Sequence, residues 1–213
     1  MSLFRLDASI LPGTSAGAEL ADIVEAEWTA VHPDEPVVRR HLGTDPLPAG
    51  AWVQAHTGAL TPEPDRTPAQ RDARLLAESL VAELEAAEAV VLAVPLYNFG
   101  VSQHFKTWVD LVISGAPLAC PVLKDKPTVL ATVRGGGYAP GTPREGWDHS
   151  TPYLRRILAD VWQADLTVVE RELTLAASPG MEPLGDLAAD LHAKALTAAG
   201  EAGRDIATTS TFR

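Results

Sequence analysis

The fold of this chain is constrained above all by a regular alternation of short apolar runs with longer segments of helical periodicity. The apolar runs have the length of strands and are bounded by turn residues; they cover residues 3–7, 37–42, 89–94, 128–133 and 166–170. After each run, apolar residues recur at intervals of three and four, which is the spacing of one buried helix face. This order predicts a parallel sheet with crossover helices.

Five helical stripes are expected to face the core; they are Leu20/Ile23/Val24/Trp28, Leu76/Leu80/Leu84, Phe105/Trp108/Val109/Val112, Leu154/Ile157/Leu158/Val161 and Leu184/Leu187/Leu191. The third and fourth strands are almost wholly apolar, so we expect them to be central. Residues 43–69 are expected to be a long Pro-rich connection. The predicted fold class is α/β, a flavodoxin-like, three-layer, doubly wound five-stranded parallel sheet. In such a sheet the ligand site lies beyond the carboxyl ends of the strands.

Composition narrows the possible partners. The 213 residues, 46% of them apolar, predict a single domain over residues 1–206, with a disordered tail at 207–213. The net charge of −11 argues against nucleic acid as a partner. No apolar run approaches the roughly 20 residues that cross a bilayer, and no secretory signal is recognisable, so we expect no membrane partner and a cytoplasmic location. With Cys120 as its one cysteine and no convincing histidine ligand spacing, the chain is expected to bind no metal.

The loop after the first strand is a candidate phosphate site. Hydroxyl groups at Ser9, Thr14 and Ser15 precede a helix, and Ala16 and Gly17 lie at its start. Free amides and the positive end of the helix dipole favour an anion at such a position. The alternative is an ordinary loop in which Thr14 or Ser15 caps the helix.

The loop after the third strand, Pro95-Leu96-Tyr97-Asn98-Phe99-Gly100, places two aromatic residues in a surface turn. Aromatic area is usually buried unless a flat ligand or a partner covers it. The amide of Asn98 suits the polar edge of a heterocycle. The alternative is that both aromatics fold back onto the core.

The loop after the fourth strand begins Arg134-Gly135-Gly136-Gly137. Residues without a Cβ let the backbone lie close against a ligand, and Arg134 offers charge for an anionic reduced cofactor. The alternative is a glycine turn with a solvated arginine. All three loops follow strands that converge on one crevice in this fold. Together they predict a pocket for flavin mononucleotide (FMN), with the phosphate at the first loop and the ring between the other two.

These loops, with residues 103–110 (QHFKTWVD) and 151–154 (TPYL), resemble the FMN-dependent NADH azoreductases, also described as NADH:quinone oxidoreductases. The resemblance covers roughly residues 3–199, and the Pro-x-Tyr-Asn-Phe block is its most specific element. It implies a homodimer with one FMN per subunit near the interface, which reduces quinones and azo compounds in two-electron steps. By position, Ser9 and Ser15–Gly17 match the phosphate loop of the family. Residues 96–99 match the segment beside the flavin ring, and residues 133–136 match the loop at the pyrimidine edge of the ring.

Some positions depart from the family pattern. Gly17 stands where a second loop serine is usual, which removes one hydroxyl from the phosphate site, and Val133 stands where a serine is common. The segment 115–126 is shorter than its counterpart and lacks an aromatic residue to cover the flavin. The loop 138–150 is longer and carries Tyr138, Trp147 and His149 as a replacement lid, unless these three only pack on the surface.

The expected mechanism is a ping-pong reaction in which NADH or NADPH reduces FMN, leaves, and is replaced by a quinone or azo compound. His149 is the candidate catalytic proton donor, because an imidazole titrates near neutral pH, at about 6.5. Two alternatives are a flavin reductase dedicated to one metabolite and a flavin electron carrier without turnover.

The helix over residues 102–113 predicts an interface. Phe105 and Trp108 follow one stripe, and Leu111 and Ile113 lie off it. One helix face cannot bury them all, so part of this surface is expected to meet the second subunit of a homodimer.

Overall fold

The computed structural model describes residues 1–178, 180 and 182–211. Five parallel strands form one sheet in the order β2-β1-β3-β4-β5. Their bounds are β1 Leu3–Asp7, β2 Val37–His41, β3 Ala89–Ala93, β4 Pro127–Val133 and β5 Asp165–Arg171. The flavodoxin-like α/β fold is therefore confirmed, and each observed strand end lies within one residue of its predicted position.

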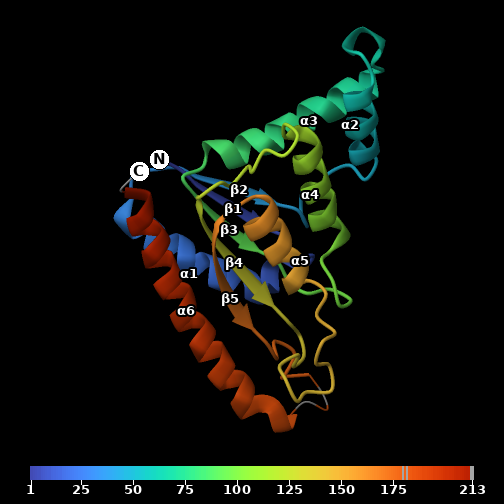
Figure 1. Ribbon diagram of the computed structural model, residues 1–213. Helices are drawn as coiled ribbons and strands as arrows, with labels where there is room; N and C mark the ends of the chain where they lie inside the picture. Colours follow the sequence, from blue (N-terminus) through green and yellow to red (C-terminus); the bar gives the residue numbers. More distant parts are fainter. Residues whose placement is uncertain (179, 181, 212–213) are drawn as a thin grey trace.

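Helices cover both faces of the sheet (Figure 1). On one face lie α1 Ala16–Val31 and α6 Gly185–Thr211, and on the other lie α3 Pro68–Ala86, α4 Gln103–Gly115 and α5 Thr151–Arg155. A π-helical turn, Arg156–Val161, continues α5. Side chains along β1 point alternately to the two faces of the sheet. Phe4 and Leu6 therefore pack in one hydrophobic core, and Leu3 packs in the other.

The connection 43–69 is not the simple loop that its prolines suggested. It contains α2 Ala51–Leu60 and a short 3₁₀ turn, Glu63–Asp65. The helix α2 packs beside α3 and α4 through small residues, with Ala51, Ala55 and Gly58 buried. Small buried residues leave no hydrophobic stripe in the sequence, which explains why periodicity missed this helix.

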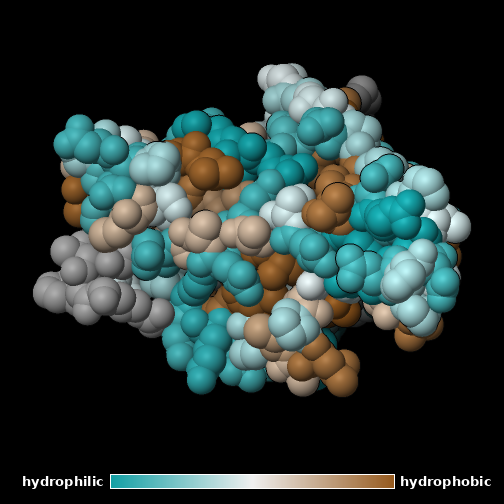
Figure 2. All heavy atoms as spheres, turned by 90° about the horizontal axis from the view of Figure 1, so that it is seen from above, coloured by the Kyte–Doolittle hydropathy of each residue, from teal (hydrophilic) through white to brown (hydrophobic). Residues whose placement is uncertain are grey.

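Several large apolar side chains remain on the surface of α2, α3 and α4. Trp52 and Val53 on α2 are about half exposed, as is Ile113 on α4, and Leu75 on α3 is two-thirds exposed. Viewed from above, hydrophobic atoms lie in several patches between hydrophilic side chains (Figure 2). Leu111, by contrast, is fully buried, so the prediction that it lies off the packed face of α4 is wrong. α4 buries two faces because α3 and α2 pack beside it as well as the sheet.

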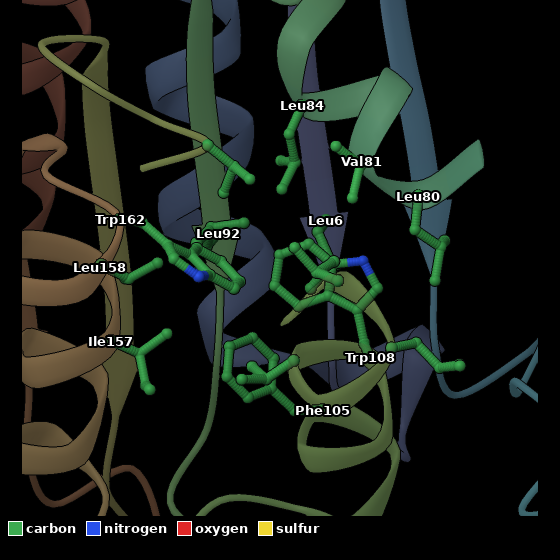
Figure 3. Close-up of a cluster of buried hydrophobic side chains, with 14 of the residues drawn as sticks. Leu6, Leu80, Val81, Leu84, Leu92, Phe105, Trp108, Ile157, Leu158 and Trp162 are labelled. Carbon is green, nitrogen blue, oxygen red and sulfur yellow. The ribbon is translucent and has the colours of Figure 1, made fainter. Parts of the chain in front are cut away.

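The core between the sheet and α3–α5 is built around aromatic side chains (Figure 3). Trp108 lies between Phe105 and Trp162, with ring centroids 5.4 Å and 5.5 Å away. Leu80 and Leu84 of α3 and Leu158 of the π-helical turn close the cluster. All of these residues are buried, which confirms most of the predicted stripes on this side.

The core beneath α1 and α6 is built from smaller residues. α6 contacts α1 through Ala195, Ala199, Ala202 and Ile206, all of which are buried. The predicted stripe at 184–191 is wrong, because Leu184 and Leu187 are exposed. The first turns of α6 extend beyond the end of β5, so the sheet offers them no apolar surface (Figure 1).

The predicted disordered tail is also largely helical. α6 continues to Thr211, and the side chain of Ala207 is fully buried. The Nε2 atom of the His32 ring donates a hydrogen bond to the Ala207 carbonyl at 2.9 Å, which fixes this end of α6 on α1. Residues 212–213 of the expected tail lie outside the described residues. Among the described residues, no helix is both long and apolar enough to cross a membrane.

Candidate functional site

A cavity of about 370 Å³ lies at the carboxyl edge of the sheet. Its walls come from the loops after β1, β3 and β4 and from the segment after β5. The lining residues are Ser9, Leu11, Thr14, Ser15, Ala16, Pro95, Leu96, Tyr97, Val133, Gly135, Thr174 and Leu175. This volume falls within the range of small-molecule sites, roughly 300–1,000 Å³. The three predicted loops therefore do converge on one crevice.

The first loop presents hydroxyl groups at the start of α1. The Ser15 side chain accepts a hydrogen bond from the Ala18 amide at 3.2 Å, so it is a helix cap, as the alternative held. It also lines the cavity together with Thr14 and Ala16. The helix dipole of α1 is therefore directed at the cavity, and an anion is favoured there. Gly17 lies buried one residue further on and does not line the cavity.

Tyr97 connects the loop after β3 to the loop after β1. Its hydroxyl lies 3.3 Å from the Ser9 hydroxyl and accepts a hydrogen bond from the Ile10 amide at 3.2 Å. The Ser9 hydroxyl in turn accepts one from the Leu11 amide at 3.1 Å. Because Ser9 is buried, these contacts fix the path of the first loop beside the cavity.

Gly43, which follows β2, supports the same loop from behind. A Cβ at this position would overlap the carbonyl oxygen of Ser9. The backbone at Gly43 and the Ser9 segment therefore approach each other in a way that only glycine permits. Sequence reasoning missed Gly43, and its position immediately after the second strand was the available signal.

Asn98 and Phe99 form the tip of a tight turn and do not line the cavity. Two hydrogen bonds of 2.9 Å join the backbones of Tyr97 and Gly100, and both tip residues have left-handed backbone angles, with φ of 48° and 67°. Asparagine tolerates this region, but phenylalanine there costs on the order of 1–2 kcal/mol. Phe99 is 41% exposed, and Tyr97 faces the cavity, so neither aromatic ring folds back onto the core.

Gly135 lies under a strap formed by residues 173–175. The amides of Thr174 and Leu175 donate hydrogen bonds to the carbonyls of Arg134 and Gly135, both at 3.1 Å. A Cβ at Gly135 would lie 2.7 Å from the Leu175 side chain, so glycine leaves room for that leucine. The Gly136 carbonyl accepts a hydrogen bond from the Leu173 amide at 3.3 Å, and Gly136 does not line the cavity. Sequence reasoning missed Thr174 and Leu175, although both follow the fifth strand at the same sheet edge.

Arg134 does not line the cavity, which corrects the expectation that its charge faces an anionic ligand there. Its buried guanidinium forms ion pairs with Asp148 at 2.8 Å and with Glu170 and Glu172, both at 2.7 Å. Burial would lower the pKa of Arg134, but hydrogen bonds and charge from these carboxylates raise it above its ordinary value. The site's polar character therefore comes from hydroxyl groups and backbone, not from this cation.

Asp148 is held as a carboxylate by its neighbours. Burial would raise its pKa, but the amide and hydroxyl of Thr151, the Ser150 amide and the charge of Arg134 together lower the pKa below its ordinary value. The same hydrogen bonds, 2.7–2.9 Å long, hold the start of α5 in place.

The three residues of the expected lid lie at different places. Trp147 packs edge-on against Phe99, with ring centroids 5.6 Å apart. Tyr138 lies beneath the guanidinium of Arg144 at 6.0 Å. The His149 amide donates to the Phe99 carbonyl at 2.9 Å, but its exposed side chain does not line the cavity. Trp147 thus extends the turn after β3, while the proton-donor role of His149 stays a prediction.

The residues that line the cavity fit FMN. The hydroxyl groups of Thr14 and Ser15 at the start of α1, with that of Ser9 after β1, suit a phosphate. A second hollow of about 810 Å³ shares Thr14, Ser15, Ala16 and Thr174 with the cavity. Leu11, Leu96 and Leu175 supply apolar surface, and Leu175 is more than half exposed. An exposed leucine in a concave site is typical of a surface that a ligand covers.

Comparison with known proteins identifies the family of the chain and its fold. Residues 1–193 match the model of a family described as having a flavodoxin-like fold. A Frankia alni protein named FMN-dependent NADH:quinone oxidoreductase is 37% identical over 193 residues, which cover 87% of this chain and 90% of that protein. A Streptomyces avermitilis protein of the same name is 36% identical over 212 residues, 97% of each chain. The crystal structure of an azoreductase from Bacillus anthracis superposes with a TM-score of 0.75 at 18% identity, covering 96% of this chain and 99% of the other.

Proposed function

Since the chain belongs to the flavodoxin-like family of FMN-dependent NADH:quinone oxidoreductases, we propose that it transfers reducing equivalents from NADH through bound FMN to quinones or azo compounds. The observation that carries this proposal is the cavity between the loops after β1, β3 and β4. It combines an anion-binding helix start with apolar walls, which is what a phosphorylated planar cofactor requires.

Each wall of the cavity has a distinct role in this proposal. Thr14 and Ser15 at the start of α1, with Ser9, hold the phosphate. Pro95, Leu96 and Tyr97 flank the ring on one side, and Val133 and Gly135 flank it on the other. FMN, when bound, supplies the redox chemistry, and the chain supplies position and polarity. A ping-pong order follows if donor and acceptor use the same open side in turn.

We also propose that the protein is a homodimer. Ile113 on α4 and Leu75 on α3 expose apolar surface on neighbouring helices. A twofold dimer is the commonest closed assembly, and it would cover such surface. The cytoplasmic location expected from the sequence remains a prediction.

Titration of the apoprotein with FMN, followed by flavin fluorescence, tests the cofactor. We expect saturation at about one FMN per chain. The saturated protein should then oxidise NADH in the presence of a quinone, at a rate that depends on both substrates. If FMN does not bind at micromolar concentrations, the proposed function is wrong. If FMN binds without catalytic turnover, the protein is a flavin carrier.

A further inference from the structure

The turn that follows β2 is organised around one histidine. The Nδ1 atom of the His41 ring accepts hydrogen bonds from the Gly43 and Thr44 amides, at 3.1 Å and 3.2 Å. The His41 carbonyl accepts another from the Asp45 amide at 2.9 Å. Three successive backbone amides therefore donate to this one residue. More often, asparagine or aspartate holds a turn in this way.

These hydrogen bonds determine the protonation state of the ring. A neutral imidazole has one nitrogen that accepts and one that donates, whereas both nitrogens of an imidazolium donate. Because Nδ1 of His41 accepts two amides, the structure requires a ring whose proton is on Nε2. Protonation of Nδ1 would break both hydrogen bonds and place a donor opposite two donors. The turn therefore depends on neutral His41.

The turn lies directly against the first wall of the cavity. The Leu42 amide donates to the Asp7 carbonyl at 2.8 Å, which joins the start of the turn to the end of β1. Gly43 then approaches the Ser9 carbonyl so closely that a Cβ would overlap it. Ser9 is buried and lines the cavity, and its hydroxyl lies 3.3 Å from that of Tyr97. A displacement of the turn would therefore reach Ser9, because closely packed backbone atoms leave no space to absorb it.

We propose that neutral His41 is a positioning residue for FMN, which holds the turn after β2 against Ser9, and that protonation of this ring weakens FMN binding. The inference rests on the proposed function, because that function assigns Ser9 to the phosphate of the cofactor. FMN binds best to the form of the protein in which Nδ1 accepts hydrogen bonds. Affinity therefore falls as the pH falls and the ring takes up a proton.

The ring shares its face of the sheet with charged side chains. In the register of the parallel strands, Asp7 lies opposite His41 and Arg5 lies opposite Arg39. Ion pairs join these side chains to one another and to carboxylates of α1, and a further carboxylate follows on the exposed turn. The full set is Arg5, Asp7, Asp22, Glu25, Arg39 and Asp45. A variant that changes His41 alone leaves all of these groups in place, so it isolates the contribution of the imidazole.

Two variants of His41 test its role in FMN binding. His41→Asn keeps an acceptor that cannot be protonated, and His41→Ala removes the acceptor. At pH 8 we expect the Kd for FMN to rise about fivefold in His41→Ala and to stay within about twofold of the wild type in His41→Asn. Between pH 8 and pH 5.5, the Kd of the wild type should rise about fivefold more than that of His41→Asn. The FMN phosphate titrates equally in both experiments, so this difference belongs to the chain.

His192→Gln is the matched control for the pH dependence. This histidine of α6 contacts Glu19 in the first turn of α1, at 3.0 Å. The control variant should keep the pH dependence of the wild type. Loss of that dependence in His192→Gln would overturn the proposal, and so would an equal dependence in the wild type and His41→Asn.

Hydrogen exchange on the apoprotein tests the positioning role without the cofactor. In His41→Ala, the amides of residues 43–44 should exchange about tenfold faster, and so should those of residues 10–11 in the first loop. The Leu42 amide, which binds β1, should change less than about threefold, which would show that the sheet is intact. His41→Asn should restore the rates of the wild type. Unchanged exchange at residues 10–11 would overturn the link between the turn and the cavity. If the wild type binds no FMN, the proposed function fails, and these exchange rates still decide the positioning role.

Discussion

Individual residues support the site from outside the cavity, and Gly43 is the sharpest case. We expect Gly43→Ala to displace the Ser9 carbonyl, because a Cβ has no room against it. Overpacking of this kind costs about 1–3 kcal/mol of unfolding free energy, and FMN binding should weaken with it. Gly50→Ala is the control, since a Cβ there meets no atom within 4 Å, and its effect should stay within about 0.5 kcal/mol. Urea unfolding and FMN titration of both variants test this, and equal effects would contradict it.

Tyr97 offers a second test at this scale. Tyr97→Phe removes the hydroxyl that lies 3.3 Å from Ser9 and accepts the Ile10 amide. Without these contacts, the first loop loses about 1 kcal/mol of stabilisation in its binding conformation, so the Kd for FMN should rise roughly fivefold. Tyr138→Phe, outside the cavity, should leave the Kd unchanged. A Tyr97→Phe variant with wild-type affinity would show that the hydroxyl does not order the loop.

The residues of the site could be predicted only where a strand end marks them. Ser9, Tyr97 and Gly135 each lie in a loop at the carboxyl end of a strand, so the sheet topology brings them together. Arg134 follows the same rule, but the sequence did not reveal that its charge is neutralised, because the carboxylates that pair with it lie 14 to 38 residues further along the chain. Pairing over such distances leaves no local signal.

Among the elements, α1 and α6 approach each other closely at Gly203. A Cβ at Gly203 would lie 2.8 Å from the Glu27 Cβ and 3.0 Å from the Val24 backbone. Alanine normally stabilises a helix by about 1 kcal/mol over glycine, but overpacking against backbone costs about 1–3 kcal/mol. Gly203→Ala should therefore destabilise the fold. Gly200→Ala should stabilise it by up to about 1 kcal/mol, because only the ends of the flexible Arg204 and Glu27 side chains lie within 4 Å of the added Cβ. Urea unfolding distinguishes the two, and stabilisation by both would contradict the close contact.

The loop after β4 should carry an acid-dependent part of the stability. The pKa of Asp148 is lower in the fold than in the unfolded chain, so its contribution is present in full above that unfolded pKa, about 4. It is lost as pH falls through the lowered value. Asp148→Asn should cost about 1–3 kcal/mol at pH 7, and its difference from the wild type should shrink below pH 4. A difference that is constant between pH 7 and pH 2 would contradict the pKa shift.

The sequence predicted helices correctly where their buried faces consist of large side chains. The stripes of α1, α3 and α4 rest on leucine, tryptophan and phenylalanine, whereas α2 and the packed half of α6 use alanine and glycine. Alanine differs little in hydrophobicity from its polar neighbours, so α2 was missed and the stripe of α6 was placed about three turns too early. Small residues allow the close contact between α1 and α6, and for the same reason the sequence shows no clear hydrophobic stripe there.

At the scale of the whole molecule, the proposed dimer gives a direct test. Ile113→Glu places a charge on exposed apolar surface of α4, and it should separate the subunits and weaken FMN retention. Leu187→Glu on α6 is the control, since it introduces the same charge at a side chain of similar exposure on the opposite side of the sheet. Sedimentation at micromolar concentration provides the measurement. A flavin-saturated monomer in the wild type would contradict the dimer.

The cavity draws its walls from Ser9, Leu96, Gly135 and Thr174, which span most of the chain. During synthesis on the ribosome, these segments emerge one after another, and a nascent chain that stops before Thr174 lacks the strap over Gly135. FMN binding is therefore expected late in synthesis, after the segment that contains Thr174 has been translated. Truncated translation products would compete poorly for a limited cellular supply of flavin.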